Sequence, residues 1–541
     1  MKKSFKYISV IIIVSLGGCT DIIDLNSESN IAAADYYTDF TELQAGLTSC
    51  YKGLQKPLVE EWSLTELRSD NTTSATGSST STVNQDFSYL DQFYPSTSHQ
   101  GNYNYWLSTY NNIRNTNVIL AKLGAKYDTT NNTIVLDQTI PLIISAKTGA
   151  IDFTLNNKRN VMAAEASFIR AYHYFNLVRL YGGVFLIHEV LPPAETKTVN
   201  RSSVDDIYKL IIADLKNAVT YCNKYNYATL VASYQDQIGH ANKWAAQALL
   251  AKVYLTLGRN AEAAVLLQSV ISSSGYGLET TYANVFSTNN EMNKEILFAI
   301  RFKSGGVGMG NPLSNLFAIS NSGLAIINGD GKGYNTPTPE LTANTFSTWD
   351  PSQARRLVNF SSFSGKYYIS KYMSKTALAN DAENDWPVIR YADVLLMKAE
   401  ADGNSVASMA LINQVRTRIT TSSGSAVQPD VFEKALSNER RWEFAFENQR
   451  WFDLLRFETT TSTVSPPTDA YPGLKVQGAE YTMKKHFANI FTDVYSKFTN
   501  TLPLTLVQLV ENANPKRFLL PIPQYEIDTN SNIAIPQNPS Y

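Results

Sequence analysis

The strongest constraint on the fold is a series of helical apolar patterns in the middle of the chain. Residues 162–181 carry apolar side chains nearly all round a helix, and two glycines follow directly. A helix of this kind is buried on most of its sides. Apolar residues spaced by three and four positions also recur in residues 207–222, 246–257 and 388–399. The centre of the chain is therefore predicted to be a set of packed helices.

Several of these helices come as pairs joined by short turns. Residues 245–270 resemble a tetratricopeptide unit, with a helix rich in small residues, a Leu-Gly-Arg-Asn turn and a second helix. Such pairs stack because neither helix can bury its apolar face alone. The repeats keep no regular period, so long insertions at 275–387 and 457–515 are expected to interrupt them. Short strand-like pieces occur at 296–302 and 366–372. The fold class predicted is mainly α, with helical pairs and a large, irregular, loop-rich face.

The first residues have the pattern of an export signal. Three lysines precede a short apolar run, which ends in Leu16-Gly17-Gly18-Cys19. A run of about 10 apolar residues is too short to span a bilayer, which needs roughly 20. The cysteine after two small residues resembles a bacterial lipobox, in which the thiol is lipidated and becomes the new N-terminus. Residues 1–18 are thus predicted to be a signal peptide, Cys19 the lipidated residue and 19–35 a flexible tether. The alternative is an ordinary secretory peptide with a chance cysteine.

Charge and cysteine content narrow the classes of function. The formal net charge is −2, which gives no electrostatic argument for binding nucleic acid. After Cys19 only Cys50 and Cys222 remain. They could form one disulfide in an oxidising compartment, or they could be two buried free thiols.

At this point the sequence resembles the SusD/RagB family of Bacteroidetes outer-membrane lipoproteins. The resemblance rests on blocks in a fixed order along nearly the whole chain. They include the Trp-Leu-Ser-Thr-Tyr-Asn-Asn-Ile-Arg segment from Trp106, the helix from Ala164 to the glycine pair, and the Arg-Trp-Phe-Asp-Leu-Leu-Arg segment from Arg450. The chain closes with Leu-Pro-Ile-Pro-Gln-Tyr-Glu-Ile from Leu520 and Pro-Gln-Asn-Pro-Ser-Tyr from Pro536.

The resemblance implies a scaffold of about four tetratricopeptide repeats in a single domain over residues 36–541. Helical repeats are expected at about 36–54, 104–124, 160–274 and 388–457, and a loop-rich ligand face at about 60–103, 275–387 and 457–515. It also implies a glycan ligand and a partner, a SusC-like TonB-dependent barrel that receives the glycan. The protein would be anchored by lipid in the outer membrane, facing outward. No cofactor is expected, and whether calcium orders a loop stays open.

The sequence offers little that would support catalysis. The five histidines are scattered without metal-ligand spacing, and no nucleophile elbow or Walker loop occurs. The densest charge cluster, residues 439–456, contains carboxylates that could in principle serve as acid and base. On one predicted helix from Phe432 to Arg456, however, Glu447, Arg450 and Asp453 are spaced for ion pairs. A structural role is favoured there, as it is for Glu165 with Arg170 and Arg390 with Asp393. No catalytic or metal-binding residue is predicted.

A sugar ring binds where aromatic faces lie beside planar hydrogen-bonding side chains. Three loop regions mix these residue types: around Asp70, from Tyr94 to Trp106, and from 311 to 350. In SusD-like proteins the stretch before the Trp-x-x-x-Tyr-x-x-Ile helix commonly contributes to the ligand face. The candidate ligand-binding residues are Asp70, Asn71, Tyr94, Asn102, Tyr103, Tyr105, Trp106, Asn311, Tyr334 and Trp349.

Three other functions remain open at this stage. The first is a RagB-like subunit that binds oligopeptides for the same kind of transporter, and the scaffold motifs cannot separate it from a glycan binder. Aromatic residues in the loops favour glycan. The second, an extracellular hydrolase, would need a nucleophile or an acid pair in a cleft. The third, a scaffold that binds only protein, would carry no aromatic patch opposite the repeats.

Overall fold

The computed structural model describes residues 37, 39–74, 82–137, 155–230, 237–342, 354–418, 432–460, 478–497, 505–530 and 532–541. The predicted signal peptide, Cys19 and the tether lie outside these residues, and so does Trp349.

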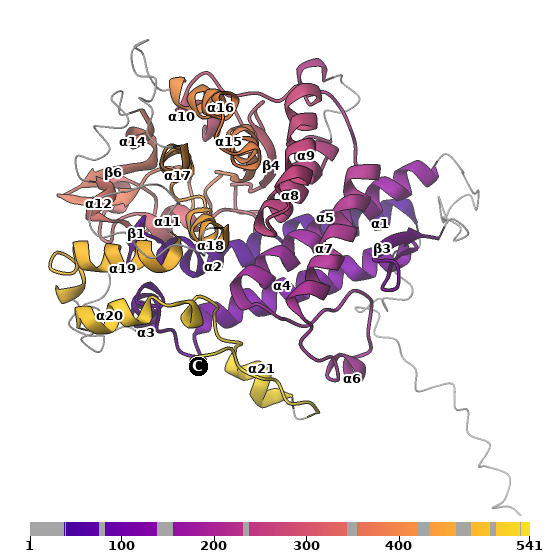
Figure 1. Ribbon diagram of the computed structural model, residues 1–541, viewed down its shortest axis with the longest axis horizontal. Coiled ribbons are helices and arrows are strands. Elements are labelled where there is room, and N and C mark those ends of the chain that lie inside the picture. The colour runs from indigo at the N-terminus through magenta and orange to yellow at the C-terminus, as the bar shows by residue number, and fades with distance from the viewer. Residues whose placement is uncertain are drawn as a thin grey trace, which may run out of the picture.

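The core of the molecule is an array of helices that pack one after another (Figure 1). Among the described residues the array forms four successive pairs: α1 (Phe40–Lys52) with α4 (Gln100–Lys122), α5 (Leu155–Tyr181) with α7 (Val204–Tyr221), α8 (Lys243–Thr256) with α9 (Asn260–Ser273), and α15 (Tyr391–Asp402) with α16 (Val406–Thr417). Each pair also packs on the next. The prediction of a mainly α fold built from helical pairs is confirmed.

Helix α5 is the centre of this array, as its sequence predicts. Nearly every described side chain from Met162 to Tyr181 is buried. The helix ends at Tyr181, and Gly182 directly after it has a φ of +71°, in the left-handed region that favours glycine. A Cβ on Gly183 would lie 2.6 Å from the carbonyl oxygen of Ser202, so no side chain fits there. The chain then returns to α7, where the Ser203 hydroxyl accepts from the backbone N–H of Asp206 at 3.1 Å.

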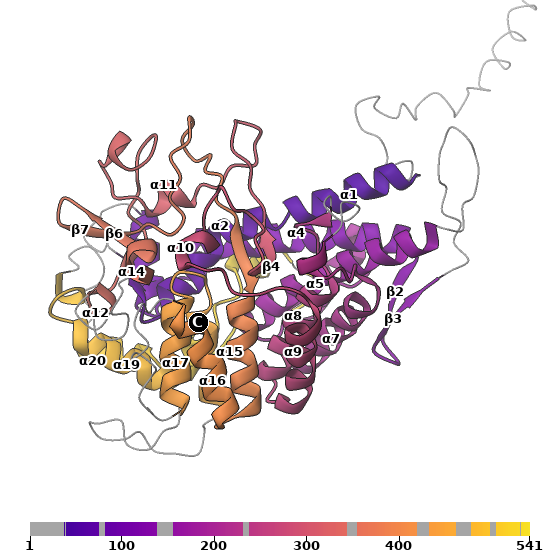
Figure 2. The ribbon, with the colours of Figure 1, turned by 90° about the horizontal axis from the view of Figure 1, so that it is seen from above.

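The segment between α9 and α15 builds an irregular second region. Figure 2 shows its loops on one side of the molecule and the helices α15 and α16 on the other. It contains short helices and antiparallel strand pairs, in chain order α10 (Tyr282–Val285), β4 (Ile296–Ile300), α11 (Leu313–Phe317), β5 (Thr336–Pro337), α12 (Pro339–Thr342), α14 (Ala354–Asn359), β6 (Phe360–Phe363), β7 (Lys366–Ile369) and β8 (Trp386–Arg390). Strand β4 pairs with β8, β6 with β7, and β5 with β1 (Thr72–Thr73). Strands β4 and β8, the first and last strands of this insertion, lie side by side. The insertion therefore starts and ends against the scaffold.

The remaining elements fill the gaps around these two regions. Between α1 and α4 lie α2 (Gln55–Leu64), the short 3-10 helix η2 (Glu66–Arg68) and α3 (Thr82–Asp91). A hairpin of β2 (Ala125–Asp128) and β3 (Thr133–Leu136) follows α4, and the four-residue α6 (Pro193–Thr196) lies between α5 and α7. After α16 come α17 (Phe432–Glu443), α18 (Arg450–Thr460), α19 (Ala479–Ile490), α20 (Leu506–Asn512) and α21 (Gln524–Thr529).

Three sequence predictions differ from these elements. The single helix predicted from Phe432 to Arg456 is two helices, because Phe446 and Asn448 in the turn have φ of +67° and +58°. Helix α19 lies in a stretch predicted as loop, although Met483, Phe487 and Ile490 have helical spacing and are buried. Helix α3 begins at Thr82, within the stretch of about 60–103 that was predicted to be loop-rich.

The last described segment is fastened to the end of α5. The backbone N–H of Leu520 donates to the carbonyl of Leu180 at 2.8 Å, and the Asn538 side chain donates to the carbonyl of Tyr181 at 2.9 Å. Arg201 donates to the carbonyl of Pro536 at 2.6 Å. Helix α21 projects from this segment at the lower edge of Figure 1.

Cys50 and Cys222 are both buried and free, so the disulfide that the sequence left open does not form.

Candidate functional site

The charge cluster at 439–456 is a buried ion network that joins the scaffold to the insertion. Arg390 donates to Glu295 at 2.7 Å, to Glu443 at 2.8 Å and to Glu447 at 2.8 Å, and all four side chains are fully buried. Lys371 also binds Glu447 at 2.7 Å. The structural role predicted for this cluster agrees with these contacts, because its carboxylates are held by cations.

The partners in this network differ from those that the sequence predicts. Arg450 binds Asp70 at 2.7 Å instead of the predicted partners Glu447 and Asp453, and the predicted helix is broken before Arg450. Arg170 binds Asp214 at 2.8 Å, whereas Glu165 binds Tyr51 and His240. Asp393 binds Lys252 and Arg440 instead of Arg390. The predicted ion pairs within single helices are therefore replaced by pairs between elements.

Asp70 and Asn71, two of the candidate ligand residues, belong to this interior. Asp70 binds Arg441 at 3.1 Å as well as Arg450, and these two guanidinium groups hold its pKa well below the usual range although burial acts to raise it. The Asn71 side chain donates to Glu66 at 2.9 Å and accepts from Arg441 at 2.9 Å. Neither side chain has exposed surface on which a ligand could bind.

The candidates on α4 separate according to the side of the helix on which they lie. Asn102, Tyr105 and Trp106 are buried, and the Asn102 amide donates to the carbonyl of Pro521 at 2.9 Å. Trp106 packs edge-on against Tyr181 with ring centroids 4.9 Å apart. Tyr103, on the other side, is partly exposed. The structure thus leaves one of these four aromatic or amide side chains accessible.

The candidate ligand residues in the other loops also divide into buried and accessible side chains. Asn311 is fully buried, and its side chain donates to the carbonyl of Asn384 at 2.8 Å. Tyr334 is half-buried and packs on Phe87 at 4.9 Å between ring centroids. Tyr94 is 46% exposed, with the Arg517 guanidinium 4.9 Å from its ring centroid. Trp349 lies outside the described residues.

The accessible Tyr103 has an aromatic neighbour that the sequence did not single out. Its ring centroid lies 5.0 Å from that of Tyr525 on α21, with the two planes tilted by 55°. Tyr525 is 58% exposed. The backbone N–H of Gln524 donates to the carbonyl of Thr97 at 2.9 Å and fixes α21 against the loop before α4. We call Tyr103 and Tyr525 the tyrosine pair.

Planar polar side chains lie on the same first turns of α4 as Tyr103. Gln100 donates to Asn104 at 2.8 Å, and Asn104 donates to Glu60 at 3.2 Å. Burial raises the pKa of Glu60, while its hydrogen bond with Asn104 lowers it. Gln100 is exposed and Asn104 is partly exposed, so amide groups remain available near the aromatic pair. Tilted rings beside carboxamides can stack on an apolar sugar face and bond to hydroxyls.

Neither a metal centre nor a membrane span is found in the part of the chain that the structure describes. No group of three or more His, Cys, Asp or Glu residues there could hold a metal ion. No helix among these residues is both long and apolar enough to cross a bilayer.

Comparison with known proteins gives matches over both halves of the chain. A family model described as "Starch-binding associating with outer membrane" matches residues 23–255, and the model of the SusD family matches residues 281–541. SusD-like protein P2 of Formosa agariphila is 28% identical over 437 residues, which are 71% of this chain and 75% of that protein. SusD-like protein P38 of the same organism is 24% identical over 522 residues, 86% of this chain and 94% of that protein.

Solved structures show the same fold. A laminarin-binding SusD-like protein superposes with a TM-score of 0.67 at 23% identity, covering 93% of this chain and 100% of that one. Surface glycan-binding protein A from Bacteroides thetaiotaomicron, in complex with laminarihexaose, has a TM-score of 0.67 at 18% identity with the same coverage. With two family models matched in tandem and the helical-pair fold shared along nearly the whole length, the chain belongs to the SusD/RagB family.

Proposed function

We propose that the protein is a surface-exposed lipoprotein that binds an oligosaccharide or polysaccharide and delivers it to a SusC-like TonB-dependent transporter. It acts by binding and carries out no catalysis. The proposal is supported by family membership, because solved relatives with this fold include a laminarin-binding protein and a complex with laminarihexaose.

The single observation that carries the proposal onto this chain is the tyrosine pair. The exposed ring of Tyr525 and the partly exposed ring of Tyr103 have centroids 5.0 Å apart, and the amides of Gln100 and Asn104 lie on the same first turns of α4 as Tyr103. Ring surface in water is costly unless a ligand covers it, and the C–H face of a pyranose is a suitable cover. Peptide capture requires no such stacking surface, so the pair favours glycan over the RagB-like alternative.

Titration calorimetry against a glycan panel, including laminarin oligosaccharides, tests this proposal. Tyr103→Ala and Tyr525→Ala should each weaken the binding of the glycan that the wild type binds, whereas Tyr103→Phe should keep most of the affinity. Tyr221→Ala is the matched control, because Tyr221 is 41% exposed at the end of α7 on the scaffold. Binding of oligopeptides without any glycan would instead support the RagB-like function.

The anchor is tested separately from the ligand. Mass spectrometry of the membrane fraction should find a mature N-terminus at lipidated Cys19, and Cys19→Ala should abolish processing and lipidation. The transporter is tested by purification of the anchored protein from outer membranes, where a TonB-dependent barrel should co-purify. Normal lipidation of the Cys19→Ala protein would contradict the anchor and leave the glycan proposal untouched.

A further inference from the structure

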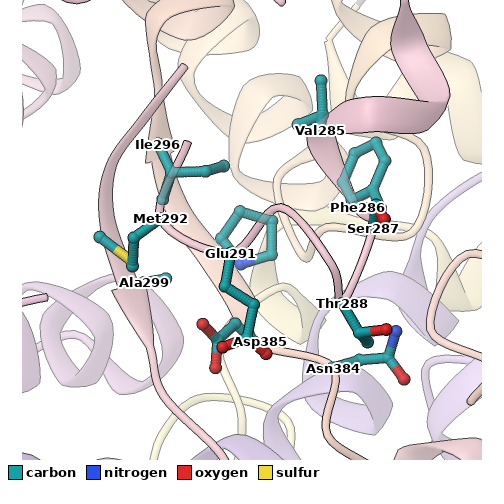
Figure 3. Close-up of a pocket in the computed structure, with 11 residues that line it drawn as sticks. Val285, Phe286, Ser287, Thr288, Glu291, Met292, Ile296, Ala299, Asn384 and Asp385 are labelled. Atoms are coloured by element: carbon teal, nitrogen blue, oxygen red, sulfur yellow. The ribbon is translucent and has the colours of Figure 1, made fainter. Parts of the chain in front are cut away.

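A pocket with one apolar wall and one acidic wall lies between the loop after α10 and the segment before β8 (Figure 3). It encloses about 330 Å³ of empty space, part of it open to solvent. The apolar wall belongs to a small hydrophobic cluster separate from the main core, made of Val285, Met292, Ile296 and Ala299 with Phe286 packed against it. The polar wall is formed by Glu291, Asn384 and Asp385. None of these residues belongs to the tyrosine pair.

The side-chain oxygen of Asn384, on the polar wall, has no hydrogen-bond partner among the described residues. The residue is only 5% exposed, and its Oδ1 is buried without a hydrogen bond in the described structure. Its main chain is fixed, because its carbonyl accepts from Asn311 at 2.8 Å. Buried polar groups are almost always hydrogen-bonded, so this oxygen is able to accept a hydrogen bond from an occupant of the pocket.

Two carboxylates approach each other on the same wall, as Figure 3 shows for Glu291 and Asp385. Arg301 satisfies one side of each: it donates to Glu291 Oε2 at 2.8 Å and forms an ion pair with Asp385 Oδ2. Asp385 Oδ1 accepts from the backbone N–H of Phe302 at 2.9 Å. Glu291 Oε1 is buried and has no partner among the described residues. The pocket therefore presents acceptor oxygens that still lack donors.

The local charge balance is negative. The charged groups around Glu291 are Asp385, Glu383, Arg301 and Lys303, so that three carboxylates face two cations when all of them are ionised. Lys303 is already paired with Glu383 at 3.1 Å. A positively charged occupant would restore neutrality.

The size of the inner space decides which cation fits. It has room for one or two groups of the size of a water molecule, which admits an ammonium head and leaves any sugar ring attached to that head in the outer, open part of the pocket. An ammonium has three donors and no acceptor, which matches the unpartnered oxygens. An aliphatic stem attached to it would lie along the apolar wall.

We propose that this pocket binds a primary ammonium group on a short aliphatic or sugar stem, with Glu291 and Asn384 accepting its hydrogen bonds. The shared chemistry comes from two sources, a lysine side chain of a peptide or the amine of an amino sugar. The inference does not depend on the glycan proposal, since it uses different residues.

A pH dependence follows from the same geometry. Burial raises the pKa of Asp385 to about 7, Arg301 opposes this rise and Glu291 adds to it. A bound ammonium favours the ionised carboxylate, so binding should release a proton and should be tighter at pH 8 than at pH 6.

Thermal shift and calorimetry with n-butylammonium chloride test the proposal on the full-length mature protein at constant ionic strength. Butylammonium should raise the melting temperature and 1-butanol, its neutral counterpart, should not. Glu291→Gln and Asn384→Ala should each weaken butylammonium binding at least tenfold. Glu262→Gln, which alters an exposed surface pair with Arg259 on α9, is the control and should bind like wild type.

Equal shifts with butylammonium and butanol would overturn the proposal, and so would unchanged affinity in both pocket variants. Competition by Nα-acetyl-lysine amide would assign a peptide source, and competition by glucosamine an amino-sugar source; displacement by neither would contradict the site. Glu291→Gln should leave glycan binding at the tyrosine pair intact, so failure of one proposal is distinguishable from failure of the other.

Discussion

The ion network around Arg390 and the tyrosine pair use polar and aromatic chemistry in opposite ways. In the network every carboxylate that meets Arg390 is fully buried and bound by at least one cation. In the tyrosine pair two rings touch each other but keep part of their surface in water. The ion network therefore holds the scaffold and the insertion together, whereas the tyrosine pair remains accessible to a ligand. Exposure, rather than residue type, separates the groups that a ligand could reach from the structural ones here.

The largest effect is expected from breaking the network. Arg390→Ala would leave Glu295, Glu443 and Glu447 buried without their shared cation. Removing one partner of a buried ion pair costs about 3–5 kcal/mol. Urea unfolding should show a loss of this size, whereas Lys209→Ala, in an exposed pair with Asp206, should leave the free energy of unfolding unchanged. Wild-type stability in Arg390→Ala would refute the structural role.

A second test uses neighbours on α4. Trp106→Ala removes a side chain that is 1% exposed and should cost about 3–5 kcal/mol of unfolding free energy, as large-to-small core changes do. Tyr103→Ala should cost far less stability but should weaken glycan binding about three- to tenfold, because an aromatic contact contributes about 0.5–1.5 kcal/mol. Calorimetry and denaturation on both proteins measure the two effects. A swap of the two phenotypes would contradict the assignment of the two sides of α4.

Acid should weaken the network in a predictable window. The folded-state pKa of Asp70, Asp393 and Glu443 is held below its ordinary value by guanidinium and ammonium partners, against the effect of burial. Each carboxylate thus adds stability that is complete above an unfolded pKa of about 4 and is lost as the pH falls below it, by about 1.4 kcal/mol for each unit of depression. The free energy of unfolding should fall steeply between pH 5 and pH 2. A flat profile would contradict this prediction.

The smallest effect concerns the two thiols. Burial raises the pKa of Cys50 to about 11, opposed by a hydrogen bond from Thr116, and raises that of Cys222 well above its ordinary value. Neither thiol should react with Ellman's reagent at pH 8 in the folded protein, and both should react in denaturant. Rapid labelling of the folded protein would show that the scaffold opens at these positions.

Local sequence patterns predicted much of the scaffold. Helix α5 and the strand at Ile296 follow from apolar periodicity and from the glycines after Tyr181. The buried side of α4 could also have been predicted from the sequence, since one face of the helix carries Asn102, Tyr105, Trp106 and Thr109 and does not carry Tyr103. What local patterns could not supply is pairing across the fold: Arg450 and Asp70 are 380 positions apart.

The same limit applies to the candidate site. Tyr103 was predicted from its loop context, but Tyr525 reaches it only because α21 is fixed against Thr97. The break after Glu443 escaped prediction because Phe446 is a bulky residue in the left-handed region, where the tertiary contacts of the turn override its local preference. The Phe446 backbone N–H donates to Glu66 at 2.9 Å, which helps to fix that turn.

The fastening of residues 520–538 to the end of α5 has a consequence for how the chain acquires its structure. Leu180 and Tyr181 receive hydrogen bonds from residues made more than three hundred positions later. Contacts of such sequence separation form slowly, because a long loop must close first and its closure costs conformational entropy. In a chain that is synthesised from its N-terminus, α5 would stay incompletely covered until residues 520–538 have been made. The docking of residues 520–538 onto the end of α5 would then be among the last steps of folding.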